Sequence, residues 1–351
     1  MRIKAKLLIV IFIISVCIPG FISFADVTEK LPVTLSDVEK AYGVIKGVAI
    51  HTPLVKEEAL SKICGGQVYL KLENLQHAGS FKVRGAFNKI ASLSEDERKK
   101  GVITASAGNH AQGVARAAKF YNIPATIVMP EDVPETKLEA TEAFGAEVIL
   151  YGKNFDQALA KAFEIQKETG ATFVHPFDDP MTIAGQGTIG LEILHDLPDV
   201  DVVIIPVGGG GLSSGIAVAL KGVNPSIEVI GVEPDHVPSM TRAFKYGKPV
   251  LVKPEDTIAE GTAVAKSGEL TYVILHALMD KLITVSEKEI EEAIYLLLMK
   301  DKILTEGAGA LGAAAILSGK LDLKGKNVVL IISGGNIDID ELKEILSEYG
   351  E

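Results

Sequence analysis

Residues 202–212 read Val-Val-Ile-Ile-Pro-Val-Gly-Gly-Gly-Gly-Leu, an apolar run that leads directly into four glycines. A strand that is apolar at every position fits a parallel sheet buried on both faces. Helical spacing begins at Leu212, so the glycines lie between a strand and a helix. Glycine amides at such a junction can converge on one anion at the start of the helix. We therefore predict a compact phosphate site at residues 208–212, with a flexible turn that binds no ligand as the alternative.

The alternation of short apolar strands and helices continues on both sides of this segment. The expected strands are residues 68–73, 102–104, 125–129, 147–150, 172–174, 201–206, 228–232 and 328–332. The expected helices are residues 80–93, 109–121, 135–144, 155–169, 182–194, 212–221, 287–300, 308–317 and 340–349. Because strands alternate with helices, the expected fold class is α/β, with parallel-rich sheets flanked by helices. The length of 351 residues fits one large domain or two of ordinary size.

The composition limits the class of protein. Hydrophobic residues make up 47% and charged residues 23% of the chain, which is typical of a globular protein. A formal net charge of −11 and the absence of tryptophan argue against a nucleic-acid partner or an anionic membrane surface. The two cysteines, Cys17 and Cys64, are too few for a metal cluster or a disulfide framework.

Residues 1–25 differ from the rest of the chain. A basic start is followed by the apolar residues 7–18 and by the small-x-small sequence Ser-Phe-Ala at 23–25. This layout is typical of a secretory signal. A membrane anchor also fits, since residues 7–25 approach the ~20 residues that a membrane span needs. The alternative is a misassigned start, in which case the segment is no part of the working protein.

One lysine stands where a loop enters a helix. Residues 77–86 read His-Ala-Gly-Ser-Phe-Lys-Val-Arg-Gly-Ala, and we expect Ser80 to be the N-cap of the helix. Lys82 then lies in the first turn, where the helix dipole disfavours a cation and should lower the pKa of the amine. A lowered pKa suits a lysine that forms a Schiff base, although a solvated lysine fits the same position.

Two further loops follow expected strands. Ser-Ala-Gly-Asn-His at residues 106–110 enters a helix, and its amides could hold a carboxylate at the helix start. His110 by itself also fits a structural histidine. Ser-Gly-Gly-Asn at residues 333–336 places the hydroxyl of Ser333 at the carboxyl end of a strand, where open α/β sheets bind ligands.

Taken together and in order, these segments resemble the threonine and serine dehydratase group of the fold-type II pyridoxal-phosphate enzymes. The matching segments are residues 80–86, 106–110, 185–188, 208–212, 306–310 and 333–336, and the resemblance extends over residues 34–345. The chain looks most similar to the short catabolic threonine dehydratases. The resemblance implies a fold like that of the tryptophan synthase β-subunit, with the cofactor between two domains. Residues 26–75 plus 180–351 would form the large domain, and residues 76–179 a small mobile one.

The resemblance also implies a role for each matching residue. Lys82 would bind pyridoxal 5'-phosphate as a Schiff base and then act as the base at the substrate Cα. Other contacts to the cofactor would come from Phe81, Asn109, Gly208, Gly209, Gly210, Gly211, Leu212, Gly261, Glu306 and Ser333. The substrate carboxylate would lie among Ser106, Ala107, Asn109 and His110.

The implied reaction is β-elimination. L-Threonine would give ammonia and 2-oxobutanoate, an isoleucine precursor, and L-serine would give pyruvate. The alternatives are a serine racemase, another enzyme of the fold such as threonine synthase, and an exported binding protein without activity. Racemases of the group carry a second serine where this chain has Ala107, and threonine synthases typically have aspartate at the position of Val83. An intact Lys82 disfavours the binding protein.

The same resemblance bears on metals, partners and location. Relatives with a divalent cation have an acidic ligand near the position of Ser239, after the Glu233-Pro234 pair, so no dedicated metal site is expected. The chain ends soon after Asn336, so no C-terminal regulatory domain is expected. The expected partners are an amino-acid substrate and further copies of the chain, as a dimer or tetramer; activation by AMP is left open. The catalytic part is expected in the cytoplasm, which conflicts with the signal-like start.

Overall fold

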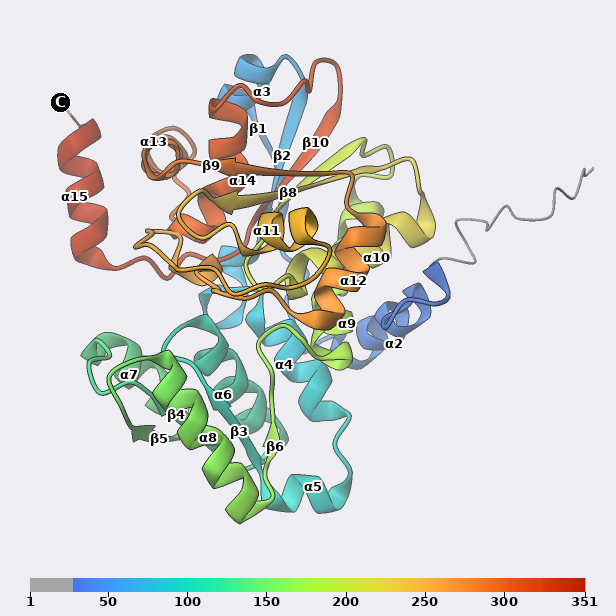
Figure 1. The fold of residues 1–351 in the computed structure, drawn as a ribbon. Helices are drawn as coiled ribbons and strands as arrows, with labels where there is room; N and C mark the ends of the chain where they lie inside the picture. Colours follow the sequence, from blue (N-terminus) through green and yellow to red (C-terminus); the bar gives the residue numbers. More distant parts are fainter. Residues whose placement is uncertain (1–27, 351) are drawn as a thin grey trace, which may run out of the picture.

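The computed structural model describes residues 28–350, and the predicted leader at residues 1–25 lies outside the described residues. The described chain contains a six-stranded and a four-stranded sheet, each covered by helices (Figure 1). No helix in this part of the chain is long and apolar enough to cross a membrane. The expected α/β class with parallel-rich sheets is confirmed.

The six-stranded sheet has the order β1-β2-β10-β7-β8-β9, and every neighbouring pair is parallel except β1 and β2. Its strands are β1 (Leu54–Glu57), β2 (Gln67–Leu72), β7 (Val202–Pro206), β8 (Glu228–Pro234), β9 (Lys281–Val285) and β10 (Asn327–Ile332). All five residues of β7 are buried, as expected for a central strand with helices on both faces.

Helices cover both faces of this sheet, and successive residues of a strand contact different helices. One face, which includes Val203 and Ile205, packs on α2 (Leu35–Ile45), α9 (Pro180–Asp196), α10 (Gly211–Val223), α11 (Ser239–Tyr246) and α12 (Glu269–Leu278). The other face, which includes Val202 and Ile204, packs on α3 (Glu58–Cys64), α13 (Glu287–Leu296), α14 (Gly307–Leu317) and α15 (Ile339–Tyr349). This period of two is the geometry of a strand.

The four-stranded sheet is wholly parallel and has the order β5-β4-β3-β6. Its strands are β3 (Val102–Ala105), β4 (Ala125–Met129), β5 (Glu147–Leu150) and β6 (Thr172–Phe173). Residues of α4 (Lys82–Ala91) and α6 (Asn109–Tyr121) share a core with one face, and residues of α8 (Phe155–Thr169) share a core with the other. The peripheral helices are α5 (Glu95–Lys100) and α7 (Glu135–Glu142).

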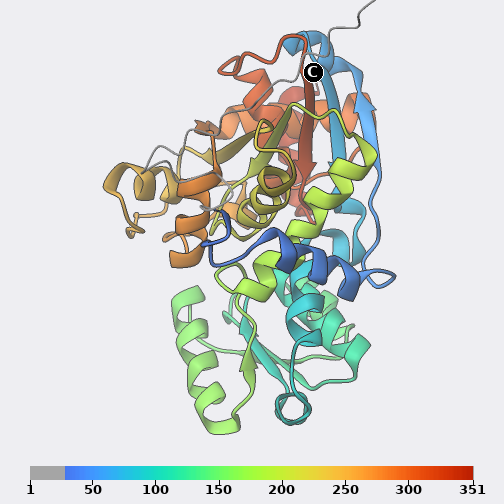
Figure 2. The same ribbon diagram turned by 90° about the vertical axis from the view of Figure 1, so that its right-hand side faces the viewer.

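The two sheets lie at opposite ends of the molecule, with α4 and α9 between them (Figures 1 and 2). The four-stranded sheet lies entirely within residues 76–179, whereas the six-stranded sheet uses strands from both sides of that segment. That residues 76–179 move as one domain stays a prediction.

Several elements differ from the expected ones. The helix expected over residues 287–300 ends at Leu296 and continues as a π turn over Leu297–Asp301. Helices α2, α3, α5, α11 and α12 and strands β1 and β9 were not among the expected elements. For α5 the reason is clear, because its residues Glu-Asp-Glu-Arg-Lys-Lys have no apolar face. Its N-terminus is capped by a capping box between Ser94 and Glu97.

Candidate active site

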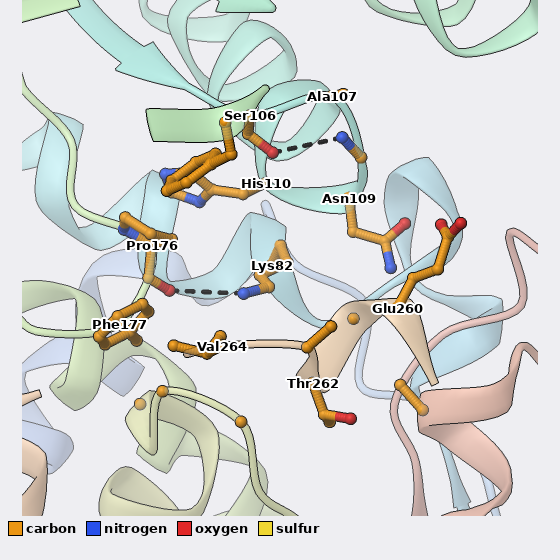
Figure 3. Close-up of a pocket in the computed structure, with 18 of the residues that line it drawn as sticks. Lys82, Ser106, Ala107, Asn109, His110, Pro176, Phe177, Glu260, Thr262 and Val264 are labelled. Carbon is orange, nitrogen blue, oxygen red and sulfur yellow. Dashed lines mark hydrogen bonds between the residues drawn. The ribbon is translucent and has the colours of Figure 1, made fainter. Parts of the chain in front are cut away.

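A cavity of about 760 Å³ is lined by loops from both sheet regions (Figure 3). Every residue that the sequence analysis placed in a site lines this one cavity. These residues are Phe81, Lys82, Ser106, Ala107, Asn109, His110, Gly208, Gly209, Gly210, Gly211, Leu212, Gly261, Glu306 and Ser333. The loops that carry residues 106–110, residues 208–212 and Ser333 follow the carboxyl ends of β3, β7 and β10, the edge where parallel sheets bind ligands.

Lys82 is the first residue of α4, and its side chain projects into the cavity (Figure 3). Within the described residues its Nζ donates one hydrogen bond, a long one of 3.5 Å to the carbonyl of Pro176. Burial lowers the pKa of Lys82 to about 8, and the Glu306 carboxyl acts in the opposite direction. The amine therefore exchanges its proton close to neutral pH, as a nucleophile or a general base requires.

Ser80 does not cap α4. Its backbone is extended (φ −161°, ψ 161°), whereas Phe81 is already helical (φ −58°, ψ −19°) and occupies the N-cap position. Ser80 pairs through its backbone with Gly334, and its buried hydroxyl has no partner within the described residues. The predicted N-cap is therefore wrong, because the Ser80 hydroxyl accepts no hydrogen bond from the first turn of α4.

The glycine loop joins β7 to α10. Gly210 has a φ of +95°, which favours glycine, and a Cβ on Gly208 would lie 2.7 Å from the Cα of Thr262. Within the described residues the amides of Gly208, Gly209 and Gly210 donate no hydrogen bond. The amides of the first turn of α10 cannot reach a carbonyl within the helix either. The loop is thus a set of free donors at a helix N-terminus, the arrangement that binds a phosphate.

Asn109 and Glu306 are joined on the opposite side of the cavity. Asn109 Nδ2 donates to Glu306 Oε1 at 2.7 Å, and Asn336 Nδ2 donates to Asn109 Oδ1 at 2.7 Å. Burial raises the pKa of Glu306, although the hydrogen bonds that it accepts from Asn109 Nδ2 and from the backbone amide of Asn336 act against the rise. Asn336 also holds the carbonyl of Ala78 at 2.9 Å, so it links the loop before Lys82 to Asn109.

His110 lies beneath the loop at the start of α6 and is neutral. Burial lowers its pKa to about 3, and the nearby Lys82 contributes in the same direction. Its Nε2 lies 2.9 Å from the carbonyl of Val174, so Nε2 carries the proton and Nδ1 is an acceptor without a partner in the described residues. The ring therefore cannot donate to a carboxylate, and only the backbone amide of His110 is suited to that task.

Further residues of the cavity were not singled out from the sequence. Phe177 lies against the glycine loop, where a Cβ on Gly209 would meet its ring. At the mouth, Lys137 of α7 forms an ion pair of 2.8 Å with Glu260 of the 3-10 helix η3 (Glu260–Thr262). Burial raises the pKa of Glu341 to about 7, with help from the charge of Glu260. These residues lie in sequence segments without a recognisable motif, so only the folded structure shows that they line the cavity.

The Glu233 carboxylate lies outside the cavity and is engaged by backbone groups. It accepts hydrogen bonds from the amides of Met240 and Thr241, at 2.7 and 2.8 Å, and from the Thr241 hydroxyl. Burial raises its pKa to about 7, although these bonds act against the rise. Glu233 thereby holds the first turn of α11.

A family model of pyridoxal-phosphate dependent enzymes matches residues 45–334. The chain belongs to this family. It is 53% identical over 316 residues to an L-threonine ammonia-lyase of Thermotoga maritima, covering 90% of this chain and 79% of that protein. It is 54% identical over 323 residues to a catabolic L-threonine dehydratase of Staphylococcus aureus, covering 91% and 93%. Among solved structures, maize serine racemase superimposes with a TM-score of 0.86 at 34% identity, covering 90% of this chain and 98% of that one.

The cavity fits the cofactor after which the pyridoxal-phosphate dependent family is named. The free amides of the glycine loop suit its phosphate, and the Lys82 amine of lowered pKa suits its aldehyde. A volume of about 760 Å³ also lies within the range of small-molecule sites. Lys82, the glycine loop, Asn109 and Ser333 are the residues that would hold it.

Proposed function

We propose that this member of the family is an L-threonine ammonia-lyase, which converts L-threonine into 2-oxobutanoate and ammonia and also converts L-serine into pyruvate. The observation that carries the proposal is the position of the Lys82 amine, in one cavity with the free amides of residues 208–212 and with the loop of residues 106–110. The two similar proteins of Thermotoga maritima and Staphylococcus aureus are named for this reaction.

The proposed mechanism assigns a task to each group. Pyridoxal phosphate, when bound, supplies an electron sink for the negative charge that develops at the substrate Cα. The amides of residues 106–110 orient the substrate carboxylate at the start of α6. Lys82 Nζ then takes the proton from Cα. Ser333, which lines the cavity, would supply a neutral hydroxyl instead of a carboxylate to the ring of the bound cofactor, and this would favour rapid β-elimination over reactions that need a long-lived carbanion.

The proposed reaction needs no oxidant or reductant, because it removes one water molecule and then adds one. Cα loses its proton to Lys82 Nζ, and the β-hydroxyl leaves as water after it gains a proton. The enamine that remains takes up one water molecule and releases ammonia, which gives 2-oxobutanoate from threonine and pyruvate from serine. Exclusion of water until release protects the enamine, so the cavity should close during the reaction.

Closure of residues 76–179 over the substrate is part of the proposal. Two groups support it, namely Lys137 of α7 and Glu260 of η3, because their ion pair joins the two sides of the cavity mouth. We further propose that the enzyme is a homo-oligomer, that its catalytic part works in the cytoplasm, where its substrate is made, and that AMP is a candidate activator.

Serine racemase is the second candidate, favoured by the similarity to the maize enzyme. Racemisation needs a second proton donor or acceptor on the opposite face of the substrate Cα. Ala107 lines the cavity at the position where racemases of the group carry a serine, and its methyl group cannot do this. The lyase is therefore favoured over the racemase.

Steady-state assays of the full chain with L-threonine and L-serine test the proposal. We expect 2-oxobutanoate and pyruvate in amounts that match the ammonia released. Chiral chromatography of the L-serine reaction should show little D-serine compared with pyruvate. D-Serine formed as fast as pyruvate would favour the racemase, and no 2-oxobutanoate from L-threonine would exclude the proposed lyase.

A further inference from the structure

Arg84 lies two residues after Lys82 on α4 and is buried on the side that faces β2 and α9. Only 1% of this side chain is exposed. All five of its N–H donors have acceptors. The acceptors are Glu73 Oε1 and Oε2, Glu192 Oε1 and Oε2, Thr188 Oγ1 and the carbonyl of Ile50, at 2.7 to 3.2 Å. A guanidinium that contacts two carboxylates at once is held in both position and orientation.

The network continues to the six-stranded sheet. Lys71, on β2 and fully buried, forms an ion pair of 2.7 Å with Glu192 and lies 3.6 Å from Asp196. Its Nζ also donates to the carbonyl of Thr52 at 2.7 Å. Glu192 and Asp196 belong to α9, whereas Glu73 follows β2 directly. Arg84 therefore joins α4 to two elements of the six-stranded region.

The helices α4 and α9 also meet through their backbones beside Arg84. A Cβ on Gly85 would lie 2.8 Å from the carbonyl oxygen of Thr182, and one on Gly185 would lie 2.7 Å from that of Arg84. The amide of Gly85 donates to Gln186 Oε1 at 3.2 Å. Small residues at both positions let the helices approach closely, and the charged network is adjacent to this contact.

Lys82 gains little positional restraint from its own side chain, whose hydrogen bond to the Pro176 carbonyl is 3.5 Å long. The position of its amine therefore depends on how the first turn of α4 is held. That turn carries two cations, Lys82 and Arg84, at the positive end of the helix dipole, which is unfavourable without acidic partners. Glu73 and Glu192 provide those partners for Arg84.

We propose that Arg84 is a positioning residue, which holds the first turn of α4 against β2 and α9 by contacting Glu73 and Glu192 together and so places Lys82 Nζ in the cavity. The inference rests on the proposed function, because it concerns the lysine that binds the cofactor and takes the Cα proton. Stability alone does not explain the network, since buried ion pairs are often no more stable than apolar residues of similar volume.

The main test compares two substitutions in the full-length protein, each at an ion pair between α4 and α9. Arg84→Lys keeps the buried charge but cannot contact both carboxylates with a planar fork. Lys89→Met is the matched control, because it removes the pair of Lys89 with Asp179 (2.6 Å) farther along α4. The first quantity measured is the attachment rate, which is the rate at which pyridoxal phosphate attaches to Lys82, followed by trapping the product with borohydride. The others are kcat and KM for L-threonine and the thermal unfolding temperature.

For Arg84→Lys we expect the attachment rate and kcat to fall by about 10- to 100-fold while KM changes by less than about threefold, as for a misplaced reacting group. Lys89→Met should stay within about twofold of the wild type in both rates, as for a partly exposed pair. An Arg84→Lys protein that matches Lys89→Met in attachment rate and kcat would overturn the proposal.

A second variant separates positioning from stability. Arg84→Met combined with Glu73→Gln removes one positive and one negative charge, and Glu192 keeps its ion pair with the buried Lys71, so folding is expected to be retained. This protein should unfold near the wild-type temperature but show the same loss of attachment rate and kcat. Wild-type rates would mean that the network is structural only. Because attachment to Lys82 needs no threonine turnover, failure of the proposed lyase reaction is recognised separately.

Discussion

Lys137 and Glu260 form an ion pair of 2.8 Å across the mouth of the cavity, between α7 beside the four-stranded sheet and η3 beside the six-stranded sheet. The carboxylate is 71% exposed, so the pair contributes little to the stability of the fold. The position of the ion pair matters more than its strength, because the pair bridges the two sides of the cavity mouth, which must approach each other if the cavity closes over a substrate.

Substitution Lys137→Met should therefore raise KM for L-threonine by a few-fold, about two- to fivefold, with little change in the unfolding temperature. The wild-type KM should also rise when NaCl is increased from about 0.05 M to about 0.5 M, since salt screens exposed pairs. The variant should lack this salt dependence. Lys161→Met, which removes an exposed pair on α8, is the control; an equal change in KM there would contradict the prediction.

Substitution Lys82→Ala should lower ammonia release from L-threonine by at least about 1,000-fold, because one group both binds the cofactor and moves the proton. Borohydride reduction followed by peptide mass mapping should find pyridoxal phosphate on Lys82 in the wild type and none on the corresponding variant peptide. Turnover at the wild-type rate in the variant would remove the basis of the proposed mechanism.

Substitution Gly209→Val should weaken pyridoxal phosphate binding by about 10-fold or more, because a side chain there would meet Phe177 and block the approach of the phosphate. Titration of the apo-protein with the cofactor measures the effect. Gly43→Val, at an exposed position where a Cβ would have no neighbour within 4 Å, is the control and should leave the dissociation constant unchanged. An unchanged constant for Gly209→Val would mean that the loop binds another group.

The pKa of Lys82, lowered to about 8 by burial, predicts how cofactor attachment depends on pH. Only the neutral amine attacks an aldehyde, so the attachment rate of the apo-protein should rise with pH and level off above 8. Glu306→Gln removes the carboxyl that raises the pKa of the amine, so its midpoint should move below that of the wild type. Stopped-flow absorbance at a series of pH values gives both midpoints. A shift in the opposite direction would show that Glu306 does not act on the amine.

The burial of the Asp301 carboxyl and its repulsion by Glu57 should make the stability of the fold depend on pH. Burial, and then the Glu57 carboxylate, raise the pKa of Asp301 from 3.8 to about 6. Because the pKa of Asp301 is about 6 in the folded protein and 3.8 in the unfolded one, its contribution to stability is fully present below pH 3.8. This contribution is lost as the pH rises through 6 and the carboxyl becomes charged. Asp301→Asn should therefore raise the unfolding temperature above pH 6 and not below pH 3.8. The control Asp322→Asn, at an exposed site, should show no such difference between the two pH ranges. If Asp301→Asn raised the unfolding temperature equally in both ranges, repulsion between Asp301 and Glu57 would be ruled out as the cause.

The expected elements that agree best with the structure are those with a strong local pattern. Helices α6 and α8 and strands β4 and β5 have the bounds expected from apolar spacing and from their flanking residues. The Ser80 hydroxyl does not cap α4, and Ser80 instead pairs through its backbone with Gly334, a contact far along the chain that no local pattern contains. The edge strand β9 begins with an exposed lysine and has few buried residues, so its apolar pattern is weak.

The sequence by itself determined the α/β class, the glycine loop at residues 208–212 and Lys82 at the start of a helix. Each of these depends on residues that are neighbours along the chain, through apolar periodicity, strand-to-helix junctions and the absence of side chains. Only the tertiary structure decided that Arg84 contacts Glu192, 108 positions away, and that Lys137 meets Glu260, 123 positions away. Such pairs depend on how α4 packs on α9 and how the two sheets face one cavity. No local pattern contains that packing, because it results from the burial of many distant side chains at once.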